Sequence, residues 1–181
     1  MMINPGNKFT VYRTLKPLKD KETGAHIGTQ HYLGGILEIT EIEPDFVIGT
    51  IIQSFRDMRA NDFLMPYIPR QPKITLSKSK KELNGKIIAS EENAAIFGDN
   101  TIAFINKGDN DGVVSGQQYS IYYQEKARLD PKSRKYTLLS VVDFGTIFVL
   151  RTEQTTSTVL ITRSDKSITP DAKICSPLPK R

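Results

Sequence analysis

The sequence has 181 residues, of which 38% are hydrophobic and 25% are charged, so the chain is long enough and apolar enough to bury a core. No apolar run approaches the roughly 20 residues that a membrane-spanning helix needs, and a single cysteine, Cys175, excludes an internal disulfide framework or a multi-cysteine zinc site. The formal net charge of +5 would suit nucleic acid, an anionic envelope polymer or anionic lipid, although a solvated basic surface is the simpler interpretation.

The first ten residues are largely polar and contain no apolar segment of the kind that a signal peptide has. We therefore expect no signal peptide in this chain, which makes it either a cytosolic protein or a piece of a longer precursor. Directly afterwards, Phe9 and Val11 alternate with polar residues, which is the pattern of a half-buried strand.

The next segments also favour β-structure. Thr14–Gln30 is polar and is expected to form an exposed hairpin or loop. Two runs rich in β-branched residues, Ile36–Ile42 and Phe46–Ile52, suit a pleated sheet and are separated by a turn of hairpin length. A short apolar return, Phe63–Pro66, ends this part of the chain.

Residues 67–84 are rich in proline and lysine and read as a linker, in which only Lys80–Leu83 could form a helical turn. Short strands are then expected at Ile87–Ile88, Ala94–Ile96 and Thr101–Ile105. The polar run Gly108–Gly112 is predicted to be a tight turn, because its oxygen-bearing residues are consecutive and lack the alternation and closing glutamate of a calcium-binding loop.

The remaining sequence repeats the beginning of the chain at an offset of 110 residues without a gap. Glycines, apolar positions and several charged or polar identities are kept in register. Examples of matched pairs are Gly6 and Gly116, Phe9 and Tyr119, Val11 and Ile121, Gly35 and Gly145, Ile51 and Ile161, Ser54 and Ser164, Met58 and Ile168, and Leu64 and Ile174. The second copy therefore predicts the same strands, with a second polar excursion at Gln124–Ser140.

These patterns predict an all-β protein with two homologous, small barrel-like or sandwich-like units in tandem. The first unit is expected at residues 1–66 and the second, with a short tail, at 85–181. Only the second copy is preceded by strand-like sequence, Gly85–Asp111. We therefore expect the first unit to lack strands, which could lie upstream in a longer gene product. Otherwise the linker or Gly85–Ile105 completes it, or it docks on another molecule, for example through self-association.

No pattern in the sequence predicts catalysis. There is no phosphate-binding loop, no nucleophile elbow and no cysteine with a nearby histidine. His26 and His31 are five residues apart on a polar segment, and the second copy has Tyr136 and Val141 at these positions. We therefore predict a protein that is not an enzyme and has no cofactor or metal ion.

Basic and tyrosine residues mix at two places and form a candidate ligand face, which could stack bases or sugars and attract anions. Its candidate residues are Arg13, Lys16, Lys19, Tyr123, Lys126 and Arg128. The competing interpretation is that the tyrosines pack inward from barrel strands, and we favour it.

A family resemblance comes from the second copy. The run Phe104–Gly108, followed by Asp111–Val113, Ser115–Gly116 and Tyr119–Tyr122, resembles the region after the lysin-motif (LysM) domain in bacterial envelope proteins that bind peptidoglycan. A loop around Asp-Pro, a glycine-led strand and a late turn follow at Asp130–Pro131, Gly145–Thr146 and Ile168–Asp171. The sequence departs from the family in having no lysin motif, and its late turn reads Pro170-Asp171 instead of Gly-Asp.

The resemblance implies a non-catalytic scaffold or binding protein of the bacterial periplasm or cell envelope, similar to the C-terminal part of LysM-containing proteins. Its expected partners are a cell-wall polymer or envelope proteins, without a membrane span. Two alternatives stay open: a periplasmic component of a secretion or flagellar machine, and a basic β-module that binds nucleic acid. The second rests only on charge and tyrosines, so nucleic acid is the less favoured partner.

Overall fold

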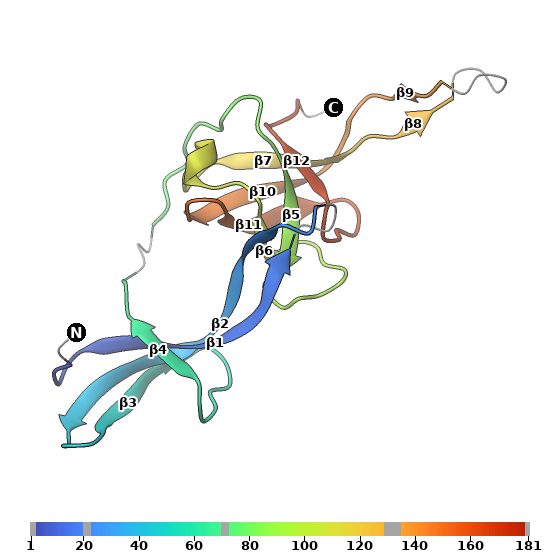
Figure 1. Ribbon diagram of the computed structural model, residues 1–181. Coiled ribbons are helices and arrows are strands. Elements are labelled where there is room, and N and C mark those ends of the chain that lie inside the picture. Colours follow the sequence, from blue (N-terminus) through green and yellow to red (C-terminus); the bar gives the residue numbers. More distant parts are fainter. Residues whose placement is uncertain (1–2, 20–22, 70–72, 129–134, 180–181) are drawn as a thin grey trace. The chain divides into compact units, whose positions relative to one another are not determined.

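The computed structural model describes residues 3–19, 23–69, 73–128 and 135–179. In these residues the ordered elements are β-strands and one short 3-10 turn, η1 (Asp109–Asp111). The prediction of an all-β protein is therefore confirmed. The chain divides into two compact units, one built on strands β1 to β4 and the other on strands β5 to β12 (Figure 1).

The first unit is an open sheet of four strands in the order β3-β2-β1-β4. Its strands are β1 (Lys8–Lys19), β2 (His26–Ile42), β3 (Val47–Ser54) and β4 (Phe63–Pro66). The polar excursion predicted at Thr14–Gln30 is largely a continuation of β1 and β2, because β1 runs on to Lys19 and β2 already starts at His26.

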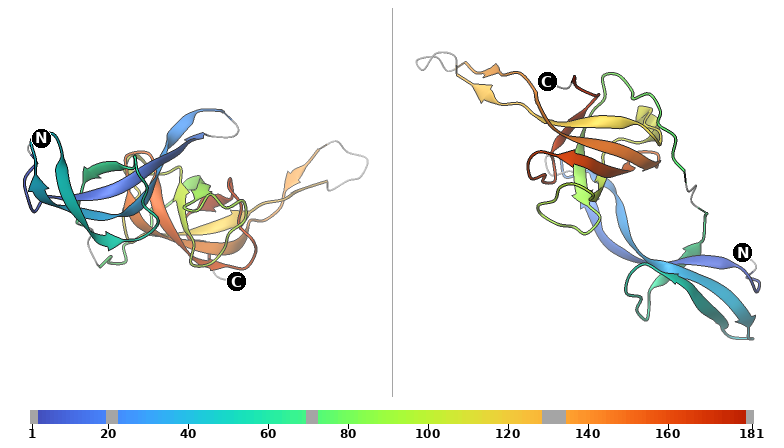
Figure 2. Two further views of the ribbon diagram at one scale, coloured as in Figure 1. Left: turned by 90° about the horizontal axis from the view of Figure 1, so that it is seen from below. Right: turned by 180° about the vertical axis from the view of Figure 1, so that it is seen from behind.

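The second unit is a closed barrel of six strands in the order β10-β11-β6-β5-β12-β7 (Figure 1). The barrel strands are β5 (Asn84–Ser90), β6 (Ile102–Ile105), β7 (Gln118–Tyr123), β10 (Val142–Thr152), β11 (Ser157–Ser164) and β12 (Lys173–Cys175). Two short strands, β8 (Lys126–Ala127) and β9 (Thr137–Leu138), pair with each other in an arm that projects from the barrel (Figure 2).

The barrel has a continuous core of buried side chains. From Ser157 to Ile161, every second residue of β11 is fully or almost fully buried, as alternation in a strand predicts. The largest fully buried side chains of this core include Ile87, Ile105, Tyr119, Ile121, Ile147, Ile161, Ile168 and Ile174. Tyr119 keeps its polar end satisfied, because its hydroxyl donates a hydrogen bond of 2.6 Å to Oε1 of Gln117.

Strand pairing in the two units coincides at the same offset of 110 residues. Gly35 pairs with Ser54 and Gly145 pairs with Ser164, and the later pairs along both hairpins match one for one. The two register shifts also fall at equivalent places, after Ile36 and Thr146 and again after Ile39 and Val149. The β2-β3 hairpin and the β10-β11 hairpin therefore have the same register and the same bulges, which is what an internal duplication predicts for them.

Glycine at the start of the repeated hairpin has a steric reason in both units. A Cβ atom on Gly35 would lie 2.3 Å from the carbonyl oxygen of Gln53, and one on Gly145 would lie 2.9 Å from that of Arg163. Two backbones therefore approach each other closely at this glycine in both units.

Three expectations need correction. The first unit is an open sheet and not a barrel, because no described strand covers the outer edges of β3 and β4. The segment Gly85–Ile105 does not complete the first unit, since β5 and β6 belong to the barrel of the second unit. Ala94–Ile96 is not a strand: its neighbour Phe97 makes only an isolated bridge to Ile168, which leaves this short apolar run in a loop.

The predicted linker is attached to the second unit over its described later part. The backbone N–H of Ser77 donates to the carbonyl oxygen of Gly116 at 3.0 Å, and Leu83 is buried in the barrel core. The predicted helical turn at Lys80–Leu83 is a hydrogen-bonded turn without helix. Residues 70–72 of the linker lie outside the described part of the chain.

Candidate functional site

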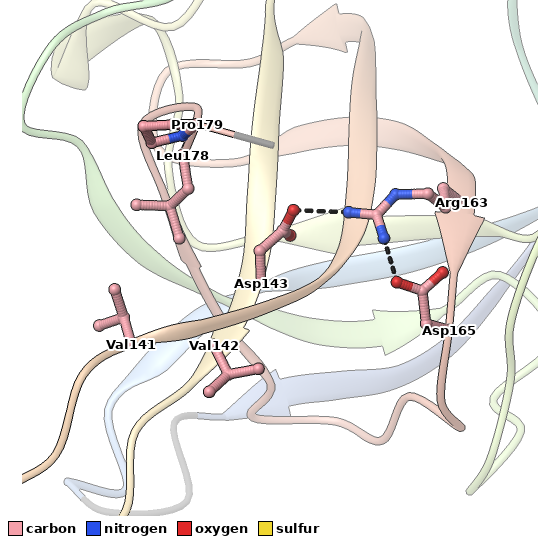
Figure 3. Close-up of a pocket in the computed structure, with 7 residues that line it drawn as sticks. All are labelled: Val141, Val142, Asp143, Arg163, Asp165, Leu178 and Pro179. Carbon is pink, nitrogen blue, oxygen red and sulfur yellow. Dashed lines mark hydrogen bonds and ion pairs between the residues drawn. The ribbon is translucent and has the colours of Figure 1, made fainter. Parts of the chain in front are cut away.

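A pocket of about 500 Å³ lies on the second unit, beside the start of β10 and the end of β11 (Figure 3). The guanidinium of Arg163 lies between two carboxylates, and its terminal nitrogen is 2.6 Å from Oδ2 of Asp143 (Figure 3). The other terminal nitrogen pairs with Asp165. The remaining lining residues are apolar: Val141, Val142, Leu178 and Pro179.

The charges of this pocket are compensated within it. Burial alone would lower the pKa of Arg163, but the hydrogen bond to Asp165 and the charge of Asp143 raise this pKa above its ordinary value. Arg163 therefore stays protonated and is held by both carboxylates. The pocket thus combines this compensated charge cluster with apolar side chains.

Cys175 on β12 also lacks the surroundings of a reactive thiol. Burial, together with the negative charge of Asp143, raises the pKa of this thiol to about 11. Since the thiolate is the reactive form, the environment of Cys175 suppresses its reactivity.

The candidate ligand face is distributed over both units. Arg13, Lys16 and Lys19 lie on β1, and the first two of them belong to the first unit. Arg13 is held by Asp62, to which its Nε and a terminal nitrogen donate at 2.7 and 2.8 Å. The hydrogen bonds from Arg13 and from the backbone N–H of Arg59 lower the pKa of Asp62, so this carboxylate remains charged. Its negative charge compensates the positive charge of the Arg13 guanidinium.

The other three candidate residues belong to the second unit, and two of them already contact neighbouring side chains. Tyr123 accepts a hydrogen bond from Nζ of Lys166 at 3.1 Å, and the same ammonium group lies 4.3 Å from its ring centre. Arg128 donates to the hydroxyl of Tyr136 at 2.8 Å. Lys126 is exposed on β8. The sequence does not indicate these contacts, because Asp62 lies 49 residues from Arg13 and Lys166 lies 43 residues from Tyr123.

Metal ligands do not gather in the described part of the chain, where no group of three or more His, Cys, Asp or Glu side chains could hold an ion. His31 packs its ring edge-on against Tyr12 with centroids 4.9 Å apart. None of the described helical segments is long and apolar enough to cross a membrane.

The most unusual surface is on the first unit and is apolar. We call it the open face and define it by Val47 and Ile51 of β3 and Leu64 of β4. These side chains are 38%, 51% and 45% exposed, whereas their equivalents at the 110-residue offset, Ser157, Ile161 and Ile174, are at most 1% exposed. Two of these pairs, Ile51 with Ile161 and Leu64 with Ile174, have nearly the same chemistry but are surface in one unit and core in the other.

The difference arises from strands β5 and β6. In the barrel, β6 pairs with β11 and β5 pairs with β12, which covers these inner positions. In the first unit, β3 and β4 are the outer strands of the sheet, so their outward backbone N–H and C=O groups are also available for pairing. The sequence signals this site through the apolar run Phe46–Ile52, which matches the barrel strand β11 at the offset of 110 residues.

Comparison with known proteins identifies no relative: no family model matches the sequence, and no curated protein matches it either.

Proposed function

We propose that the protein is a non-catalytic scaffold or binding protein of the bacterial cell envelope, resembling the C-terminal part of LysM-containing proteins, and that it holds another protein on the open face. The observation that supports binding is the exposure of Ile51 and Leu64, whose equivalents are fully buried in the closed unit. Apolar surface of this kind is costly in water and gains free energy when a partner covers it.

The pocket of the second unit supports binding less well than the open face, because its charged side chains already pair with one another. Arg163 is engaged by two carboxylates, and the pKa of Cys175 is high. The placement in the envelope rests on the family resemblance of the second copy, so it needs a separate test.

Site-specific photo-crosslinking in the native cell tests the proposed binding role. A photoreactive amino acid is placed at Ile51 or Leu64, with Leu138 as the control position because it is an equally exposed apolar residue, 56% accessible, on the arm of the second unit. We expect a discrete adduct from Ile51 and Leu64 but not from Leu138, with the partner identified by mass spectrometry. Equal yields at all three positions would contradict a specific binding face.

Fractionation of the same cells tests the compartment. We expect the protein and its adduct in the periplasmic or envelope fraction. Recovery of both only with cytosolic marker proteins would refute the envelope part of the proposal and leave the binding part standing.

A further inference from the structure

The closed barrel gives a template for what the open face lacks. In the barrel, β6 runs antiparallel to β11 with Ser157 opposite Ile105 and Val159 opposite Ala103. Strand β5 runs antiparallel to β12 with Ile174 opposite Gly85. Strands β5 and β6 also pair with each other, so together they bridge the two edges that remain open in the first unit.

Because pairing inside the two units coincides, the template can be transferred position by position. The strand equivalent to β6 would lie along Val47–Thr50, and the strand equivalent to β5 would lie along Phe63–Met65. Both edges must be filled by strands that are antiparallel to each other, which a β-hairpin satisfies. Strand addition to an exposed sheet edge is a recurring mode of peptide recognition, with main-chain hydrogen bonds for affinity and inward side chains for specificity.

The template also defines the chemistry of the missing strands. Inward residues of β5 and β6 are apolar and small or medium in size: Ile87, Ala89, Ala103 and Ile105, all of them at most 6% exposed. A filling hairpin therefore needs aliphatic residues at its inward positions, with the small ones next to the connection between its two strands, where Ala89 and Ala103 lie in the template.

The strands β5 and β6 of the chain itself cannot pair with the first unit unless the barrel of the second unit opens. Ile87, Ala103 and Ile105 are completely buried there, and withdrawing them would expose Ile161 and Ile174 instead. This applies equally to the same strands of a second copy. The occupant must therefore bring strands that are not already part of a barrel.

We propose that the open face binds a two-stranded β-hairpin of another polypeptide, which inserts between β3 and β4 and closes the first unit into a six-stranded barrel. This inference rests on the proposed function and deepens it, because it specifies the partner's local structure and its register. The partner contributes aliphatic side chains at the positions that Ile87, Ala89, Ala103 and Ile105 occupy in the second unit.

To test the proposal, a second copy of the segment that contains β5 and β6 is fused to the full chain, because these strands close the barrel of the second unit. Residues 84–115 directly precede Gly116, whose equivalent is Gly6, so a second copy of residues 84–115 is joined directly before Gly6. The matched control carries the same extension with Ile87→Asp and Ile105→Asp in the added copy only. Hydrogen exchange is measured by mass spectrometry on peptides from β3 and β4, and peptides from β10 report whether the second unit remains folded.

We expect exchange of the β3 and β4 amides to slow by about tenfold or more in the extended protein, because edge amides become ladder amides. Binding of a fluorescent apolar dye should fall in parallel, and the aspartate control should behave like the unextended chain. The photo-crosslink from Ile51 to its cellular partner should disappear in the extended protein and persist in the control.

Unchanged exchange of β3 and β4 in the extended protein, together with unchanged exchange when the 84–115 peptide is added separately to the unmodified chain, would overturn the hairpin proposal. Light scattering that finds the unextended chain as a dimer, converted to a monomer by the extension, would assign the open face to a second copy and also overturn it. Protection without any cellular adduct would instead refute the proposed function, because the face would accept a hairpin that no partner provides.

Discussion

At the scale of single residues, the two units use polar contacts differently. In the first unit, Asp62 is only 7% exposed at its side chain and joins β1 to the start of β4 through Arg13 and the backbone of Arg59. In the second unit, the equivalent position is Ala172, and the barrel closes through strand pairing instead. The ion pair therefore supports an edge strand that has a neighbour on one side only.

Replacement of this carboxylate tests its contribution to the edge. Asp62→Asn should speed amide exchange in β4 at pH 7. The variant loses the carboxylate charge that pairs with Arg13 and accepts from the backbone N–H of Arg59, next to the start of β4. Asp62 has a lowered pKa in the folded protein, so its stabilising effect is present above the unfolded value of about 4 and is lost as the pH falls through the folded pKa.

The difference in exchange between wild type and Asp62→Asn, measured at matched pH, should accordingly vanish in strong acid. Asp45→Asn, which removes an equal charge from the exposed turn between β2 and β3, serves as the control. Equal effects of the two substitutions at pH 7 would contradict a specific role for Asp62.

The raised pKa of Cys175 leads to a second prediction. With a pKa of about 11, roughly one thiol in a thousand is ionised at pH 8, against about a quarter in the unfolded chain. Alkylation by iodoacetamide at pH 8 should therefore be about 250-fold slower in the folded protein than in the unfolded chain, and it should accelerate about tenfold per pH unit up to pH 10. Rapid alkylation at pH 8 without unfolding would show that the thiol is not suppressed.

At the scale of elements, one matched pair of residues allows a core position to be compared with a position on the open face. Ile51 and Ile161 occupy equivalent places on β3 and β11, but only Ile161 is enclosed. Ile161→Ala should cost about 2–5 kcal/mol, the usual range for a large-to-small change in a core. Ile51→Ala should cost less than about 1 kcal/mol, because its side chain is half exposed already.

Urea titration with exchange readout for each unit measures both effects, and each substitution is the control for the other. A larger loss for Ile51→Ala would show that the open face is covered in the isolated protein, for example by self-association.

Most strands could be predicted from the sequence, because the apolar alternation at Phe9 and Val11 occurs again at Tyr119 and Ile121. The extension of β1 and β2 into the polar segment could not be placed, since strands exposed on both faces have no apolar alternation. The strand predicted at Ala94–Ile96 is absent, because a short apolar run can also lie in a loop. The pairing of Arg13 with Asp62 spans 49 residues and has no local signal.

At the scale of the whole molecule, the two units should differ in stability. The second unit has a closed core of fully buried side chains, whereas the first has an open sheet with apolar side chains in water. We expect two unfolding transitions in urea, with the first unit unfolding at the lower concentration, because it buries less apolar surface.

Amide exchange measured along the titration assigns each transition to its strands. Loss of β3 and β11 protection in a single common step would contradict the expectation and indicate one cooperative unit.

Closure of the barrel also fixes when it can form during synthesis. Gly85 on β5 pairs with Ile174 on β12, so the first strand of the barrel, which also pairs with β6, obtains its second neighbour only after almost ninety further residues have been made. The first sheet needs nothing beyond Pro66, where Phe9 finds its partner. Non-local pairing slows folding, and domains made first generally fold first. The first sheet can therefore be complete while the barrel of the second unit still lacks its last strand.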